Sequence, residues 1–391
     1  MYKYVILLLL CCLPLVVSAQ KKSRYERTWQ KIDSLERARL PKSALAEVEK
    51  LYLQIKTDGI KGAQQESEWL RALLYVNKYK SRLEESGVEL AIARWESESA
   101  QAKGAARALM LSMLAEMYDN YLSENLYKVS QRTNVATDVK QDNIQTWDVR
   151  RFADKIFDLY RQSLQEPSTR TIALADYAAL LHSSDKREES NTQPYLYDLL
   201  AQRALAFYMS GKTHLTKPKY SFYVEQTEAL ASAAEFVQAK FSTQDSSSGE
   251  FQALLLFQDL LRFHANDKDA SALVYIDFLR LMYMHKVSTL ADKEARYLQQ
   301  LERLEQGQPK TEIRAQVAHE IALRWQMRGK FYYPNNAHSF EHRWHLRKAL
   351  ELVNAALKKY TKQSVGRSNL LALKNSIEEK TFSFSTEQAV A

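Results

Sequence analysis

Apolar residues recur at steps of three and four along most of this chain, and this spacing constrains the fold more than any other feature. In "RALMLSMLAEMYDNYL", Met110, Leu114, Met117, Tyr118 and Tyr121 share one face of a helix. The segment "RRFADKIFDLYRQSL" repeats the pattern. The periodicity predicts about fourteen helices of roughly 12 to 22 residues joined by short turns.

Glycine and proline are scarce, with nine and seven residues, and they separate the apolar runs. Pro41 precedes one run, Gly59 and Gly62 end it, and Gly87 and Gly104 open the next two. These residues therefore mark the expected helix ends.

Two serine–glutamate pairs have the spacing of a capping box, in which the serine caps an amide and the glutamate reaches back. They are Ser86 with Glu89 and Ser247 with Glu250. We expect a helix to begin at each pair.

The length of the chain excludes a single compact core. Its 391 residues exceed the size, roughly 250 to 300 residues, at which one core stops growing. We predict an all-α fold: an irregular TPR-like α-solenoid of antiparallel helical hairpins over residues 20–380, with a short extended C-terminal segment. No fixed repeat register is visible, so "TPR-like" describes architecture only. The polar stretches 183–193 and 242–249 are predicted exposed loops or subdomain seams.

Residues 1–19 have the pattern of a secretory signal peptide. Lys3 precedes an apolar run from Val5 to Leu13, and Val17 and Ala19 occupy the positions that signal peptidase recognises. We expect cleavage between Ala19 and Gln20 and an exported protein, periplasmic or at the cell surface. No second long apolar segment follows, so we expect no membrane span after cleavage.

Both cysteines of the chain, Cys11 and Cys12, lie inside this signal. The rest of the chain can form neither disulfides nor thiolate nucleophiles nor Cys-ligated zinc sites. A lipoprotein is the less favoured alternative, because neither cysteine follows the small residue that lipidation requires.

Charge gives no indication of nucleic-acid binding. Lys and Arg number 55 against 47 Asp and Glu, a formal net charge of +8, but the two signs are interspersed. Mixed signs are typical of a solvated surface, and an exported protein rarely meets nucleic acid.

One short stretch resembles the end of a phosphate-binding loop. Gly211, Lys212 and Thr213 have the right order, but Ala206 stands where the loop needs its first glycine. The stretch also follows a predicted helix rather than a strand. We expect a helix C-terminus with Gly211 in the left-handed conformation.

Three histidines gather in "HSFEHRWHL". His338, His342 and His345 would share one helical face, so a metal site is sterically possible. No carboxylate pattern completes it. We expect polar-face residues beside a packed Trp344.

Acidic and aromatic clusters also favour structural roles. Asp267 and Asp269 lack the glycine and terminal glutamate of a calcium loop, so we expect a turn with Asp269 as a helix cap. The clusters "LYDLLAQRALAFY" and "FYYPNN" are predicted to pack in the core and between helices. The residues alone thus nominate no catalytic, cofactor or metal site, and they predict a non-catalytic helical scaffold.

Several segments together resemble a known family. The phrases "TWDVR" and "LYDLLAQRAL" belong to stretches that are similar, in order, to the amino-terminal helical region of large alpha-2-macroglobulin-like proteins exported by certain Gram-negative bacteria; these stretches are residues 32–52, 132–164, 193–208, 257–281, 342–352 and 365–380. In that family the helical region precedes β-sandwich macroglobulin domains, a protease-cleavable bait segment and often a thioester. The resemblance implies a protease inhibitor whose working parts lie outside this chain.

The last residues, "KTFSFSTEQAVA", differ from the rest. Phe382 and Phe384 alternate with serines, as in a half-buried strand. Ser385 stands where a thioester would need cysteine, so Glu387 and Gln388 are no thioester site. The resemblance makes 381–391 an extended strand or linker into a β-domain absent from this chain. The other short alternation is "KYSFYVE", residues 219–225.

Two functional hypotheses follow. In the first, the chain is the non-catalytic helical scaffold of an exported macroglobulin-like protease inhibitor, with the downstream β-domains, and through them target proteases, as protein partners. In the second, a stand-alone exported α-solenoid binds peptides or envelope proteins on its concave face.

Overall fold

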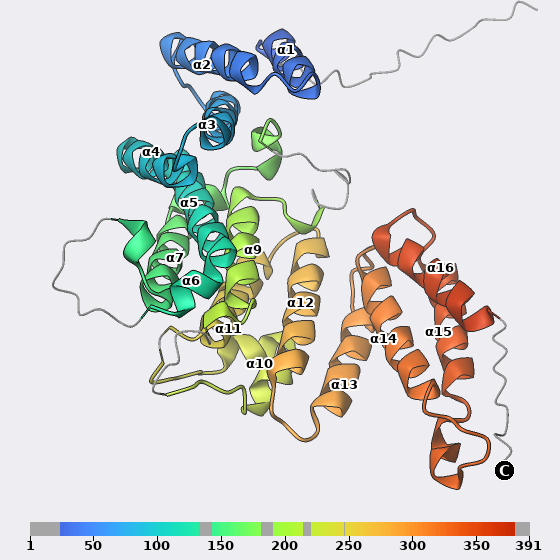
Figure 1. The fold of residues 1–391 in the computed structure, drawn as a ribbon. Helices are drawn as coiled ribbons and strands as arrows, with labels where there is room; N and C mark the ends of the chain where they lie inside the picture. Colours follow the sequence, from blue (N-terminus) through green and yellow to red (C-terminus); the bar gives the residue numbers. More distant parts are fainter. Residues whose placement is uncertain (1–23, 133–142, 181–190, 214–219, 246, 380–391) are drawn as a thin grey trace, which may run out of the picture.

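The computed structural model describes residues 24–132, 143–180, 191–213, 220–245 and 247–379. These residues confirm the all-α prediction (Figure 1). Their only β-pairing is two isolated bridges, Ala173 with Tyr195 and Val224 with Ser288. No helix of the described part is long and apolar enough to cross a membrane.

The α-helices follow one another with short connections over most of the chain. Their bounds are α1 Glu26–Arg37, α2 Pro41–Asp58, α3 Ala63–Leu83, α4 Gly87–Gln101, α5 Gly104–Glu124, α6 Leu126–Ser130, α7 Val149–Ser163, α9 Leu196–Tyr208, α10 Ala233–Gln238, α11 Gly249–His264, α12 Ser271–Val287, α13 Lys293–Gln306, α14 Arg314–Gly329, α15 His345–Lys359 and α16 Val365–Glu378.

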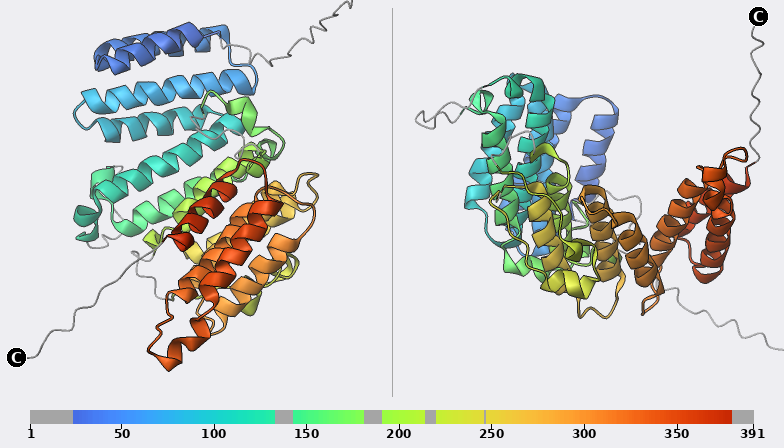
Figure 2. Two further views of the ribbon diagram at one scale, coloured as in Figure 1. Left: turned by 90° about the vertical axis from the view of Figure 1, so that its right-hand side faces the viewer. Right: turned by 90° about the horizontal axis from the view of Figure 1, so that it is seen from below.

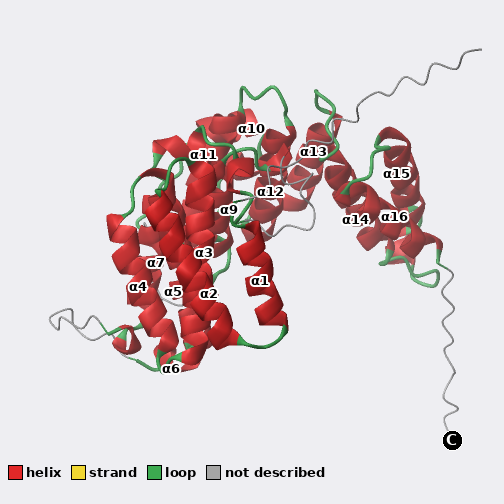
Figure 3. Ribbon diagram, turned by 90° about the horizontal axis from the view of Figure 1, so that it is seen from above, coloured by secondary structure: helices red, strands yellow, loops and turns green. Residues whose placement is uncertain are grey.

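The helices form an α-solenoid in which each one packs mainly on those next to it in sequence. From α1 to α5 the contacts run mainly from one helix to the next. Helix α5 then contacts α7 and α9, and the series continues from α9 through α11, α12 and α13 to α14. Figure 2 shows the resulting layers. Figure 3 shows α14, α15 and α16 grouped at one side of the stack.

Two apolar clusters form the core, and α14 contributes to both. The larger cluster extends from α1 to one face of α14, where Val317 and Ile321 belong to it. The opposite face of α14 packs on α15 and α16 through a second cluster of mostly small residues, which comprises Ala315, Ala318, Ala322, Val353, Ala356, Tyr360, Leu370 and Leu373. Gly366 allows the close approach of α16, because a Cβ there would lie 2.5 Å from the Gln316 amide nitrogen.

Buried indole donors join different helices of the stack. The Trp29 indole donates to Glu68 at 2.7 Å, and the Trp95 indole donates to the Met110 carbonyl at 2.8 Å. Each bond satisfies a polar atom that burial would otherwise leave unpaired.

Both expected capping boxes are wrong in detail. Helix α4 does begin after Ser86, but Ser86 has φ of +53° and makes no side-chain cap. A left-handed residue lacks the extended backbone with which an N-cap hydroxyl reaches the first turn. Helix α11 is capped by Ser248, which accepts from the Phe251 amide, while Ser247 donates to Asp245. The true pair of this kind is Ser232 with Glu235, at the start of α10.

Between α9 and α11 the chain forms an irregular segment, residues 220–245, which we call the strap. Its centre is held by Arg280 of α12, whose side chain is fully buried. The guanidinium donates to the carbonyls of Ala229 at 2.8 Å and Ala231 at 3.0 Å, pairs with Asp277 at 2.6 Å and lies 4.5 Å from the Phe236 ring. A single buried cation therefore holds residues 229–231 of the strap against α12.

Replacing Arg280 by methionine should strongly destabilise the fold. Arg280→Met keeps the apolar stem but leaves the Asp277 carboxylate and two carbonyls without their donor, so the free energy of unfolding should fall by about 3–5 kcal/mol. Arg296→Met is the control, because Arg296 and its partner Asp292 are exposed, and it should leave the urea midpoint unchanged. Equal midpoints for the two variants would contradict the organising role of Arg280.

Candidate functional site

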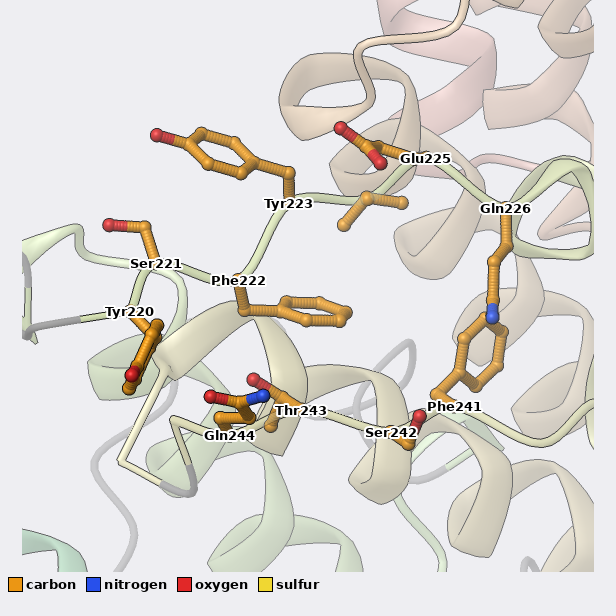
Figure 4. Close-up of a pocket in the computed structure, with 11 residues that line it drawn as sticks. Tyr220, Ser221, Phe222, Tyr223, Glu225, Gln226, Phe241, Ser242, Thr243 and Gln244 are labelled. Carbon is orange, nitrogen blue, oxygen red and sulfur yellow. The ribbon is translucent and has the colours of Figure 1, made fainter.

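A cleft of about 580 Å³ lies between the two ends of the strap. Residues 220–226 form one wall and residues 241–244 the other, as Figure 4 shows. The two walls come from segments that lie outside the regular helices, and loops held by a rigid helical frame are a common place for binding sites.

Alternating side chains hold the first wall in place. Phe222 packs edge to face on Phe251 of α11 at 5.5 Å between ring centroids, and Val224 is buried. The Val224 carbonyl accepts from the Thr289 amide at 3.1 Å, within the isolated bridge after α12. Tyr223 points the other way and is 61% exposed (Figure 4). The alternation of "KYSFYVE" thus produces an extended segment, although no sheet forms around it in the described chain.

The second wall is positioned by side chains of α11 and α10. Gln258 is buried and donates to the carbonyls of Phe236 at 2.7 Å and Ala239 at 2.8 Å. The Phe241 ring then packs on Phe236 at 5.6 Å. Both walls are therefore tied to the helices behind them, which favours a preformed cleft.

The lining is aromatic and polar, with little charge. Of the residues around the cleft, Glu225 alone is charged, and the others carry phenol, hydroxyl, amide or apolar groups. The main chain of Ser221, Phe222 and Tyr223 makes no hydrogen bond to another described residue. Unpaired extended backbone beside tyrosine, serine and glutamine is suited to an extended peptide, which can add main-chain hydrogen bonds.

The phosphate-loop candidate has the structural role that we expected. Helix α9 ends at Tyr208, and Gly211 has φ of +75° in the turn that follows. The Lys212 ammonium donates to Asp119 at 2.7 Å and to the Ser123 hydroxyl at 2.8 Å. Lys212 therefore fastens this turn to α5.

The prediction that three histidines share one helical face is wrong. His338 and His342 lie in a 3₁₀ helix, Ala337–His342, and His345 begins α15 after a break. The tighter 3₁₀ turn and the break change the angular spacing on which the prediction rested. His342 and His345 do approach, with 3.3 Å between their Nδ1 atoms. Among the described residues no group of three or more His, Cys, Asp or Glu is placed to hold a metal ion.

One of the predictions for the aromatic clusters is confirmed, and the others are wrong. Residues 196–208, "LYDLLAQRALAFY", line the core as expected. In contrast, Phe331 and Tyr333 of "FYYPNN" are exposed, and so is Trp344, which we expected to be packed. Sequence spacing gave no indication of this, because these residues lie in a connection between helices rather than on a helix face.

The turn at 265–270 is confirmed, and it takes part in a buried network that local spacing does not reveal. Asp269 accepts from the Ser271 amide at 2.9 Å, but it is not the N-cap that we expected, because Ala270 occupies the N-cap position of α12. His264, which ends α11, is bonded through Nε2 to Asp198 and through Nδ1 to Asp267, at 2.7 Å each. Asp198 also accepts from the Tyr195 amide at the start of α9. The network therefore joins α9, α11 and the turn.

Protonation of His264 should stabilise this network. Burial disfavours the imidazolium, but the bonds to Asp198 and Asp267 outweigh burial and raise the pKa of His264 above its ordinary value of 6.5. A raised folded-state pKa contributes stability that is fully present below the unfolded pKa and is lost as pH rises through the folded pKa.

The variant His264→Gln should accordingly show a pH-dependent defect. We expect wild-type protein to exceed the variant in free energy of unfolding by more at pH about 6 than at pH about 9. Urea titrations at the two pH values measure this difference, with His338→Gln, at an exposed site, as the control. A difference that is constant or grows with pH would contradict the protonated network.

Several predicted positions lie outside the described residues: the cleavage site Ala19–Gln20, the C-terminal segment 381–391 with Ser385, Glu387 and Gln388, and most of the expected loop 183–193. Comparison with family models, curated proteins and solved structures finds no match. The similarity to alpha-2-macroglobulin-like proteins therefore stays a prediction from the sequence.

Proposed function

We propose that this chain is the non-catalytic helical scaffold of an exported macroglobulin-like protease inhibitor, and that its strap cleft holds an extended segment of the protein's β-domains. The observation that carries the proposal is the main chain of Ser221, Phe222 and Tyr223, which makes no hydrogen bond to another described residue and lies in the wall that faces residues 241–244. The sequence resemblance to macroglobulin-like proteins is the reason to expect β-domains as the partner and protease inhibition as the activity of the whole protein.

The solenoid supports this role because it presents the cleft on a rigid base. The strap is fixed from behind by Gln258 and Arg280, which donate to four of its carbonyls between Ala229 and Ala239. A preformed cleft loses little conformational entropy when a partner binds. Rigid positioning of neighbouring domains is what a scaffold must provide.

A β-domain partner suits the cleft chemically. Edge strands of β-sandwiches carry unpaired amides and carbonyls, and so does the wall at Ser221, Phe222 and Tyr223 within the described residues. Pairing of the two would satisfy both sets of groups. Contact with target proteases would then pass through the β-domains rather than through the helices.

The same cleft favours a second candidate, a stand-alone exported solenoid that binds peptides of envelope proteins. Its mostly uncharged lining, with exposed Tyr220 and Tyr223 at the rim, accepts varied sequences because main-chain bonds carry the binding. The two candidates differ in the origin of the bound segment.

Site-specific photocrosslinking in cells should identify that segment. A photoreactive phenylalanine analogue in place of Tyr223 should form an adduct with a β-domain of the same protein, whereas the same analogue at Tyr127, which is exposed on α6, should not. An adduct with a separate envelope protein would favour the second candidate. Absence of any adduct specific to position 223 would contradict both.

A matched pair of substitutions tests the mode of binding. Tyr223→Ala and Tyr223→Pro both remove the phenol, but only proline removes the amide donor. If the partner pairs with the main chain, its crosslinking from a neighbouring position, Ser221, should fall severalfold more in the proline variant. Equal yields in the two variants would contradict strand pairing.

A further inference from the structure

The connection between α14 and α15, residues 330–344, forms a projecting tip at the C-terminal side of the molecule. Figure 1 shows it below the ends of α13 and α14, and Figure 2 shows it extending beyond the neighbouring helices. We call residues 330–344 the tip. It lies on different elements from the strap cleft, so its role is independent of the proposed function.

The tip exposes four large aromatic side chains. Phe331, Tyr333, Phe340 and Trp344 are between 51% and 61% exposed. Burying an aromatic ring is among the largest apolar gains available to a side chain, so four exposed rings in one short connection point to an interaction surface.

Internal hydrogen bonds order the backbone of the tip. The buried Ser339 hydroxyl accepts from the Tyr333 amide at 2.8 Å and lies 2.7 Å from the Asn336 carbonyl. Asn336 in turn accepts from the His338 amide at 3.0 Å. The exposed rings are therefore presented by an ordered loop.

Cations accompany the rings. The guanidinium of Arg343 lies 4.8 Å from the Trp344 ring, and neither Arg343 nor Lys330 has an acidic partner among the described residues. Glu341 is the one acidic residue of the tip, and it approaches His342 at 3.3 Å. The tip thus combines exposed aromatic area with uncompensated positive charge.

We propose that the tip binds the surface of an anionic phospholipid membrane. Tyr333 and Trp344 carry the kind of amphipathic ring that is favoured at the level of the headgroups, and nearby lysine and arginine are attracted to anionic lipid. A projecting tip fits a fluid, deformable surface, which needs no matching pocket. An acidic protein would need a complementary groove to cover all four rings, so lipid is the partner that the geometry favours.

Vesicle sedimentation tests the proposal. The purified protein should co-sediment with vesicles made of equal parts phosphatidylethanolamine and phosphatidylglycerol and should bind phosphatidylcholine vesicles far more weakly. Arg343→Ala and Lys330→Ala should each weaken binding about fivefold, as expected for one cation near an anionic surface. Trp344→Ala should weaken it about tenfold.

Fluorescence locates the contact on the molecule. Trp344 is the most exposed of the tryptophans in the described chain, so lipid binding should shift its emission to shorter wavelength, and Trp344→Phe should remove the shift while retaining most of the binding. Tyr127→Ala, which removes an even more exposed ring on α6, is the control and should bind as wild type does. All variants should keep the wild-type thermal midpoint.

Two results would overturn the proposal. Failure to sediment with the anionic vesicles would contradict membrane binding and would favour an acidic protein as the partner of the tip. Binding that is unchanged by both Arg343→Ala and Trp344→Ala would place the lipid contact elsewhere on the molecule.

Discussion

The structure depends on one constraint: each helix can bury its apolar stripe only against the helices beside it. A chain of this length cannot surround a single compact core. Each helix therefore buries its apolar residues against the next helix along the stack. Helix α14 shows the constraint most clearly, because Val317 and Ile321 face the larger core while Ala318 and Ala322 face α15 and α16. Helix α14 must therefore be apolar on two sides. Alanine on α14 and Gly366 on α16 allow α14 to lie close to the last two helices.

Polar side chains act where this regular packing is interrupted. The strap contains only one short α-helix, α10, and hydrogen bonds from α11 and α12 hold its irregular backbone. Arg280 and Gln258 supply donors from the solenoid to the strap's carbonyls. Such bonds stabilise an irregular backbone only if the donors are themselves fixed, and burial in the helical stack fixes them. The cleft is thus a consequence of the solenoid, although no part of its walls is α-helical.

The helices could be predicted from the sequence because apolar spacing and the positions of Pro41, Gly87 and Gly104 are local signals. The cap at Ser86 could not, because its left-handed backbone is a property of the turn rather than of residue type. The network of His264 with Asp198 joins residues 66 positions apart, and nothing local indicates that they meet. The candidate site was least predictable of all, since irregular segments carry no periodic pattern to place them.

The seam between α14 and the last two helices has a mechanical consequence. Contacts in a solenoid are arranged in series, so tension along the chain passes through every interface in turn. Interfaces lined by alanine bury less area than those lined by leucine or tryptophan, and the second cluster is rich in alanine. Close approach of the helices offsets this difference, and tension applied at the C-terminal side would reach the rest of the stack mainly through α14.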